Sequence, residues 1–389
     1  MANLLSNQNR ITLACFLAYF VMSGMLAPIG IISGPMSELF GRPITEVTAQ
    51  FSWLTIGNLC GAALALVIFD FLRVRTVFLY VYLLIVASLL SLLISSDLTL
   101  IGVALGVVGV CSGLGLASAA LVISRVYEAE RRASVLVMTD ASFSVAGFSC
   151  AAIATALVAA GFHWASTYQF VALIAAIVVI LVVVSDLPST KPDATTTEET
   201  EAWPASVWFC IAALFLYTLG QYSMLWWLPN YAETQLGASV DQAGRLVTLF
   251  WLGLFVAQLA VAWLVLKLGV KRLVLISGIS TCLFSIPLWL IGNLELLAIF
   301  AFLWGVGNFS LLKIVLSYAT QMLKIPSPRL VSSLLLGATL GTAVSPWVTS
   351  SIVVATDNYF ILQFSTLCYA TLATLLFVAT RQHNRRVNA

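Results

Sequence analysis

Two ionisable residues, Asp140 and Lys313, fall inside long apolar stretches of this sequence. Asp140 follows Arg132 by eight residues, which places it roughly 12 Å further along a helix at 1.5 Å per residue. Lys313 lies about 15 Å from the end of its apolar stretch by the same measure. A charged side chain in hydrocarbon costs at least ~2.5 kcal/mol, so each must be neutralised, paired or in contact with water. Both are therefore candidates for functional chemistry.

The residues around Asp140 allow two interpretations. Asp140 and Ser144 are spaced i, i+4 and would share one face of a helix. In the first interpretation, Asp140 is a carboxylate that binds and releases a proton. In the second, it forms an ion pair with Arg125, Arg131 or Arg132 and holds two helix ends together. The sequence leaves both open.

Lys313 belongs to a second polar stripe, which it forms with Ser310, Ser317 and Thr320 at helical spacing. A lysine on such a stripe is expected to line an aqueous cavity and to attract an anionic or polyhydroxy solute. A salt bridge with Asp140 is the alternative, because the expected depths of the two residues agree. The two roles do not exclude one another.

Asn308 lies close to Lys313 in the sequence but is not expected to join its stripe. On a continuous helix, it would lie about 140° around the axis from Lys313 at 100° per residue. We therefore expect Asn308 to face away from the cavity that Lys313 lines.

A third stripe contains Tyr217 and Gln221, which are four residues apart. Gln221 in an apolar helix must find a hydrogen bond, either with a solute or with a neighbouring helix. The residues that we expect to line a solute cavity are therefore Tyr217, Gln221, Ser310, Lys313 and Ser317.

The composition predicts an all-α membrane protein. Of its 389 residues, 61% are hydrophobic and 9% are charged, which is more apolar surface than a soluble core can bury. Apolar runs of the ~20 residues that a span needs predict twelve transmembrane helices, at about 11–37, 46–71, 76–94, 98–124, 133–160, 164–186, 205–232, 239–267, 271–292, 296–322, 328–354 and 358–380. A hydrophilic linker, 187–204, separates two six-helix bundles at 1–186 and 205–389.

The basic residues predict the orientation. All Lys and Arg except Arg42, Arg245 and Lys313 fall on one predicted side, and loops rich in Lys and Arg stay cytoplasmic. We therefore expect a multi-pass protein of the cytoplasmic (inner) membrane with both termini and the linker in the cytoplasm. The net charge of +2, carried by scattered basic residues, gives no case for nucleic acid. We expect no metal site, no cofactor and no enzymatic activity, since neither a CxxC pair nor a nucleophile motif occurs.

The two halves also resemble one another at a spacing of about 197 residues. The stretch GRPITEV at Gly41 is echoed by GASVDQA at Gly237, where Thr45 and Asp241 are expected N-caps. The basic turn that ends at Arg75 is echoed by one that ends at Arg272. Two six-helix halves with a substrate site between them are the architecture of a secondary transporter.

At these turns the chain resembles the major facilitator superfamily. The signature of that family joins the second and third helices, and Asp70 and Arg75 match it. A degenerate copy between helices eight and nine retains Lys271 and Arg272. The resemblance implies that these residues belong to charge networks that latch the cytoplasmic side. The gating candidates are Asp70, Arg75, Arg125, Arg132, Lys271 and Arg272.

Within that superfamily the chain is similar to the TsgA-like transporters, which group with the fucose-permease-type sugar–proton symporters. The similarity is carried by NQNRITL at the start, VYEAERRASVLVMTDASFSVAG around Asp140 and KIPSPRLV before the eleventh helix. It implies a monomeric secondary active transporter that moves a small polar solute by alternating access, coupled to protons. The alternatives are a drug or metabolite exporter and a transporter-like sensor without flux.

Overall fold

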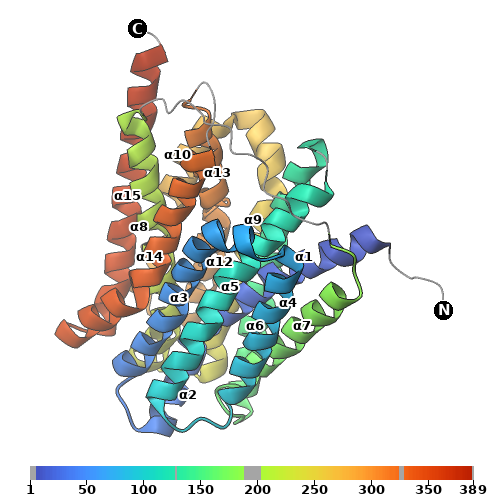
Figure 1. Ribbon diagram of the computed structural model, residues 1–389. Coiled ribbons are helices and arrows are strands. Elements are labelled where there is room, and N and C mark those ends of the chain that lie inside the picture. Colours follow the sequence, from blue (N-terminus) through green and yellow to red (C-terminus); the bar gives the residue numbers. More distant parts are fainter. Residues whose placement is uncertain (1–5, 128, 188–202, 324–327, 388–389) are drawn as a thin grey trace. The chain divides into compact units, whose positions relative to one another are not determined.

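The computed structural model describes residues 6–127, 129–187, 203–323 and 328–387 (Figure 1). The chain divides into two compact units, unit 1 (Met1–Ala194) and unit 2 (Thr195–Ala389). The helices of unit 1 are α1 (Asn7–Leu26), α2 (Ile29–Phe40), α3 (Ile44–Phe71), α4 (Val74–Ser91), α5 (Leu98–Val126), α6 (Ala129–Ala159) and α7 (Ser166–Val183). Those of unit 2 are α8 (Ala205–Leu236), α9 (Val240–Leu268), α10 (Val270–Ser285), α11 (Pro287–Leu290), α12 (Leu294–Gly307), α13 (Leu311–Thr320), α14 (Pro328–Ala355) and α15 (Asn358–Val387).

Twelve segments of the described chain are long and apolar enough to cross a membrane. They confirm the prediction of an all-α membrane protein with twelve transmembrane helices. Many of their large apolar side chains are exposed, among them Leu66, Leu259 and Leu367. These are the side chains that a bilayer would cover.

Unit 1 is built on close contact between α3 and α5, which lie side by side (Figure 1). The two backbones approach so closely that a methyl group at Gly61 would overlap the carbonyl oxygen of Val110, and one at Gly109 would overlap that of Leu54. Helix α1 packs against α6 and α7, and α4 packs against α5 and α7. Small residues at a helix interface permit this spacing, as is usual in membranes.

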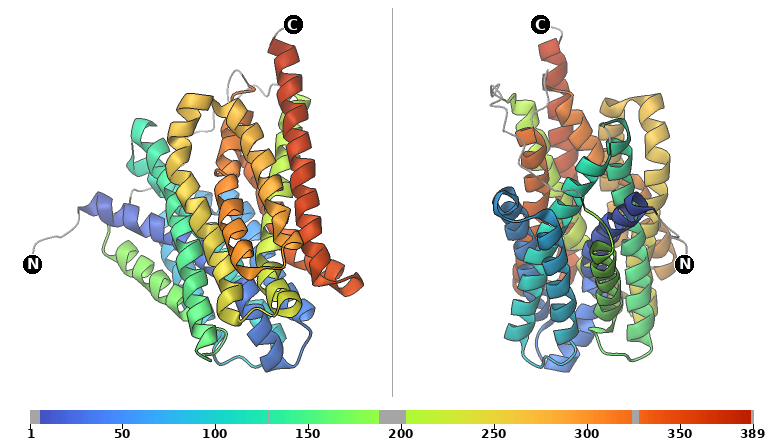
Figure 2. Two further views of the ribbon diagram at one scale, coloured as in Figure 1. Left: turned by 180° about the vertical axis from the view of Figure 1, so that it is seen from behind. Right: turned by 45° about the vertical axis from the view of Figure 1, so that its right-hand side comes forward.

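Unit 2 repeats this arrangement. Helix α9 packs against α12, α8 packs against α14 and α15, and α10 packs against α15; α8 and α15 run side by side in Figure 2. A methyl group at Gly305 would overlap the carbonyl oxygen of Phe250. The echo between Gly41 and Gly237 also has a structural counterpart, since both residues end a helix in the left-handed conformation, with φ of 60° and 66°. The N-caps are Pro43 and Ser239, however.

The N-cap prediction was therefore wrong at both positions. Asp241 lies in the first turn of α9, and Ser239 forms a capping box with Gln242 two residues from the predicted cap. A serine side chain accepts hydrogen bonds from the free N–H groups of a first turn as well as aspartate does. Ser239 and Asp241 were therefore equally good N-cap candidates on sequence grounds.

Three of the twelve predicted helices are interrupted. The first is split at Pro28 into α1 and α2, and the ninth at Ile286 into α10 and α11. The tenth, predicted to be continuous over 296–322, is split into α12 and α13. At this break, Phe309 and Ser310 have φ of 45° and 55°. In contrast, α8 continues through Pro229, as membrane helices often do when neighbours satisfy the freed backbone groups.

Candidate functional site

Asp140 lies on α6, half-buried and next to α1 in unit 1. The adjacent Thr139 shares a hydrogen bond with the hydroxyl of Tyr19 on α1, and Asp140 lies within electrostatic range of Tyr19. One half-turn further, the Ser142 hydroxyl donates to the Phe16 carbonyl at 2.8 Å. Asp140 thus lies on the part of α6 that is bonded to α1, with its charge felt at the Tyr19 hydroxyl.

The interior of unit 1 next to Tyr19 carries further polar groups. Tyr82 of α4 is buried and lies within electrostatic range of Tyr19, and its hydroxyl would lie 2.9 Å from a methyl group at Gly115 of α5. Ser144, the stripe neighbour of Asp140, is fully buried, and its hydroxyl has no hydrogen-bond partner among the described residues. Tyr19 and Tyr82 could not be singled out from the sequence, since tyrosines in a span are most often packing residues.

The gating candidate Arg75 binds within unit 1. Its guanidinium donates to the carbonyl of Val183, the last residue of α7, at 2.9 Å. A cation at the C-terminus of a helix also interacts favourably with the helix dipole. The same end of α7 is tied to the start of α1, because Asn7 donates to the Asp186 carbonyl at 3.0 Å and accepts from the Asp186 N–H at 2.9 Å.

The other gating candidates lie at helix ends. Asp70 is exposed in the last turn of α3, Arg125 is exposed in the last turn of α5, and Lys271 and Arg272 are exposed in the first turn of α10. Arg132 belongs to α6, and its side chain, like that of Arg131, lies outside the described part of the structure.

In unit 2, the solute-cavity candidates from the tenth predicted helix lie on a broken segment. Ser310 is the N-cap of α13, while Lys313 and Ser317 follow as half-buried residues of α13. The Ser310 carbonyl accepts from the Lys313 N–H at 2.9 Å. Because Ser310 has a left-handed backbone, it does not continue the helical stripe of Lys313, and the prediction that it shares a stripe with Lys313 was wrong.

The same break also changes the expected position of Asn308 relative to Lys313. The continuous helix assumed for the 140° separation from Lys313 does not exist, since two left-handed residues intervene. Asn308 is fully buried, and neither its Nδ2 nor its Oδ1 atom has a hydrogen-bond partner among the described residues. An asparagine in an apolar run already indicates a candidate polar site in the sequence. The assumption of a continuous helix led us to leave Asn308 out of the predicted site.

Asn308 is the C-cap of α12 and lies one turn after Trp304, a spacing at which helical side chains are neighbours. The Trp304 ring packs against Phe250 of α9, with centroids 4.1 Å apart, and against Tyr369 of α15 at 6.3 Å. Tyr369 in turn lies within electrostatic range of Tyr217 on α8, four residues before Gln221. Gln221 is 4% exposed, and its Oε1 lacks a hydrogen-bond partner in the described structure.

We call these five side chains the amide–aromatic cluster of unit 2; they follow one another as a chain of neighbours from Asn308 through Trp304, Tyr369 and Tyr217 to Gln221. Two of them, Tyr217 and Gln221, were predicted from the sequence, and Trp304, Asn308 and Tyr369 were missed. The cluster can stack on a ring and can both donate and accept hydrogen bonds.

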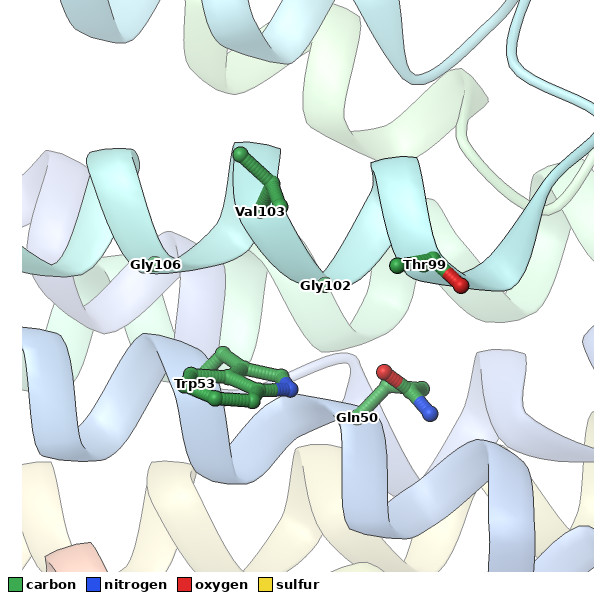
Figure 3. Close-up of a pocket in the computed structure, with 6 residues that line it drawn as sticks. All are labelled: Gln50, Trp53, Thr99, Gly102, Val103 and Gly106. Carbon is green, nitrogen blue, oxygen red and sulfur yellow. The ribbon is translucent and has the colours of Figure 1, made fainter.

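An open pocket elsewhere in unit 1 holds none of the predicted site residues. It is lined by Gln50 and Trp53 of α3 and by Thr99, Gly102, Val103 and Gly106 of α5 (Figure 3). Trp53 is largely exposed, which is typical of an aromatic side chain at a membrane–water interface.

A helical fold of two matching units, with twelve possible spans and polar groups buried in the spans, defines a membrane transporter. The model of the Major Facilitator Superfamily matches residues 12–237 and 210–389. The chain belongs to this superfamily, and it is a multi-pass membrane transporter rather than an enzyme.

Relatives in bacteria share its whole length. The chain is 28% identical to the "Protein TsgA homolog" of Citrobacter koseri and to "Protein TsgA" of Shigella flexneri, over 97% of this chain and 98% of each relative. These matches confirm the resemblance to the TsgA-like transporters.

Two solved structures share the fold. The nucleoside transporter NupG superimposes with a TM-score of 0.70 at 13% identity, covering 96% of this chain and 99% of that chain. The D-xylose-proton symporter superimposes with a TM-score of 0.72 at 12% identity, covering 94% and 96%.

Proposed function

We propose that this protein moves a small polar solute across the cytoplasmic membrane by alternating access, and that transport is coupled to protons. In this proposal, the protein acts as a monomer with both termini and the linker in the cytoplasm, as the distribution of Lys and Arg favours.

Proton coupling is supported by the position of Asp140. A carboxylate inside a span is costly, and this one is half-buried within electrostatic range of the Tyr19 hydroxyl. Hydroxyl groups accept a hydrogen bond from the protonated acid and donate one to the carboxylate. Asp140 is therefore the proposed proton-binding group, and this observation carries the proposal.

Solute binding is assigned to polar residues of unit 2. Lys313 is half-buried in the first turn of α13, and Gln221 is buried with an acceptor atom that has no partner in the described structure. Tyr217, Ser310 and Ser317 are proposed to complete the surface that contacts the solute. The D-xylose-proton symporter and the nucleoside transporter with this fold make sugars and nucleosides the first solutes to test.

Gating is assigned to the charged helix ends on the proposed cytoplasmic side: Asp70, Arg75, Arg125, Arg132, Lys271 and Arg272. The bond from Arg75 to the end of α7 supports a role in holding unit 1 together there while the transporter changes state.

The test separates coupling from binding. A thermal-shift screen against sugars, nucleosides, organic acids and siderophore-like compounds identifies a ligand, because ligands stabilise the folded state by mass action. With that ligand, Asp140→Asn in proteoliposomes should lose accumulation driven by a pH gradient and retain counterflow exchange, since the amide keeps the size of the acid but carries no proton.

The matched control is Asp97→Asn. Asp97 caps α5 by accepting from the Thr99 N–H at 2.7 Å, and asparagine caps as well as aspartate does, so accumulation should be unchanged. Wild-type accumulation by Asp140→Asn would remove Asp140 from the coupling step. Accumulation that ignores the pH gradient in the wild-type protein would refute proton coupling itself.

A further inference from the structure

The turn that joins α9 to α10 gathers positive charge on the surface of unit 2. Lys267 lies in the last turn of α9, and Lys271 and Arg272 lie in the first turn of α10. All three side chains are exposed, and we call these three residues the basic turn. The segments on either side, Val240–Val261 and Val270–Leu290, are both apolar and long enough to cross a membrane. The basic turn therefore lies at the boundary of the hydrocarbon.

The acidic residues that the structure describes in unit 2 lie at the other end of its helices. They are Glu233, Asp241, Glu295 and Asp357. Asp241 is in the first turn of α9, roughly 39 Å from Lys267 at 1.5 Å per residue. Glu295 is in the first turn of α12, beyond the far end of α10 and α11. Neither Lys267 nor Arg272 forms an ion pair within the described part of the chain.

The corresponding turn of unit 1 is built differently. It contains an exposed carboxylate, Asp70, and its Arg75 donates to the Val183 carbonyl at 2.9 Å. The charges there are balanced or engaged within the unit. In unit 2, the charges of Lys267 and Arg272 remain available to a ligand.

An exposed apolar stripe of α9 leads to the basic turn. Leu259, Trp263 and Leu266 follow one another at helical spacing and are 68%, 56% and 86% exposed. The Lys267 ammonium lies over the Trp263 ring, 4.1 Å from its centroid. This cation–π contact joins the first charge of the basic turn to the stripe. From Leu259 to Lys267 the stripe extends over roughly 12 Å at 1.5 Å per residue.

We propose that the basic turn binds an anionic phospholipid, with Lys267 and Arg272 at its phosphate and Trp263 and Leu266 against the upper part of an acyl chain. A phospholipid presents an anionic head and an apolar chain together at the boundary of a bilayer. Tryptophan and lysine side chains are suited to that boundary, and basic pockets beside spans bind anionic headgroups. Phosphatidylglycerol is favoured over phosphatidylethanolamine, because no carboxylate of the described part of unit 2 lies here to receive an ammonium group.

An acidic segment of a soluble protein is the competing partner, since it would also be attracted to the basic turn. Such a segment would leave the apolar stripe uncovered. Leu259 belongs to the span Val240–Val261, where a partner in water does not reach it. A phospholipid covers the stripe and the charges at once, so the combination favours a lipid.

The test uses the full-length protein in detergent and native mass spectrometry, which resolves the protein with and without a bound lipid. The probe is dioleoylphosphatidylglycerol, and dioleoylphosphatidylcholine is its zwitterionic counterpart. The wild type should bind phosphatidylglycerol more tightly. Lys267→Gln and Arg272→Gln should each raise the Kd of the first phosphatidylglycerol about five-fold, which corresponds to the ~1 kcal/mol of a basic residue near an anionic membrane surface. Lys267→Arg keeps the charge and should bind as the wild type does.

The matched control is Arg245→Gln. It also removes one exposed positive charge from α9, but at the end that holds Asp241, so the Kd should stay unchanged. A second measurement locates the lipid. Phosphatidylglycerol brominated along its acyl chains quenches tryptophan fluorescence on contact, and Trp263→Phe, which keeps a ring under Lys267, should lose part of this quenching.

Four results would overturn the proposal: phosphatidylcholine binding as tightly as phosphatidylglycerol, equal changes of the Kd in Lys267→Gln and Arg245→Gln, the same quenching in the wild type and Trp263→Phe, or displacement of the lipid by an equal concentration of glycerol 1-phosphate. Displacement by an equal concentration of poly-L-glutamate would assign the basic turn to an acidic protein partner instead. Lipid binding is measured without any solute, so the outcome does not depend on the proposed function.

Discussion

The close contact between α9 and α12 makes Gly305→Ala a sharp test of how the amide–aromatic cluster is positioned. The added methyl group would overlap the Phe250 carbonyl oxygen and would lie 2.9 Å from the Leu254 nitrogen. Both are backbone atoms, so no side chain can rotate away, and the helices must move apart. The neighbouring Trp304 packs on the Phe250 ring at 4.1 Å and would move with α12.

The magnitude follows from these contacts. Overpacking a core usually costs about 1–3 kcal/mol, and contacts with backbone on both sides place this site at the upper end. Weakening the Trp304–Phe250 contact adds about 0.5–1.5 kcal/mol. We expect Gly305→Ala to lower the free energy of unfolding by about 3–4 kcal/mol and to weaken binding of any solute that contacts Trp304. The control is Gly292→Ala, where a methyl group meets nothing within 4 Å, and the expected change is within about 0.5 kcal/mol.

A thiol-reactive fluorescent dye can follow unfolding. All seven cysteines are free thiols, and Cys210 and Cys368 of unit 2 are buried, so they react when unit 2 opens. Cys60 is exposed and should first be replaced by serine to remove the early signal. If Gly305→Ala unfolded at the same temperature as Gly292→Ala, α9 and α12 would not be in the close contact described here.

Three further predictions concern Arg75, His163 and the orientation of the chain in the membrane. Arg75→Gln should lower the unfolding temperature of unit 1, because it removes the hydrogen bond to the Val183 carbonyl at a cost of about 1 kcal/mol. The control Arg73→Gln should leave the unfolding temperature unchanged. Equal effects of the two substitutions would show that this hydrogen bond does not stabilise unit 1. Desolvation lowers the pKa of His163, and its Nδ1 accepts from the Ala165 N–H at 3.3 Å, so the unfolded chain takes up a proton at higher pH than the folded one. The wild-type Tm should therefore fall below about pH 6.5 and His163→Gln should lessen that fall; the same pH dependence in both would exclude His163 as its source. Reporter fusions should place Thr195 in the cytoplasm and His163 outside, and an external Thr195 would overturn the predicted orientation.

The number of spans and the internal repeat could be predicted because they depend on properties that add up along the chain. Twenty apolar residues have to be buried in lipid wherever they occur, and glycine after a helix favours the left-handed cap seen at Gly41 and Gly237. The position of Asp140 on an apolar helix could also be predicted, because an ionisable residue within a long apolar stretch is recognised from the sequence alone.

The break at Phe309 and Ser310 could not be predicted because nothing local requires it. Neither residue favours a left-handed backbone, and no proline or glycine lies between Asn308 and Lys313. The conformation is held by contacts with α10, where Ser280 and Thr281 bind the Gly307 carbonyl. Tertiary contacts of this kind override local preference. The prediction for Asn308 assumed a continuous helix, and the structure does not have one at this place.

The two units share a scaffold but not their chemistry, and this has a consequence for coupling. Unit 1 offers the half-buried carboxylate of Asp140 near Tyr19, and unit 2 offers amides, aromatic rings and Lys313. If proton and solute bind to separate groups, their coupling is a free energy between two sites, and each ligand must change the affinity of the other by the same factor. For a symporter, the Tm shift caused by the solute should grow as the pH falls in the wild-type protein. In Asp140→Asn, the shift should keep one value across the same pH range. A pH-dependent shift that survives in this variant would place the coupling proton on another residue.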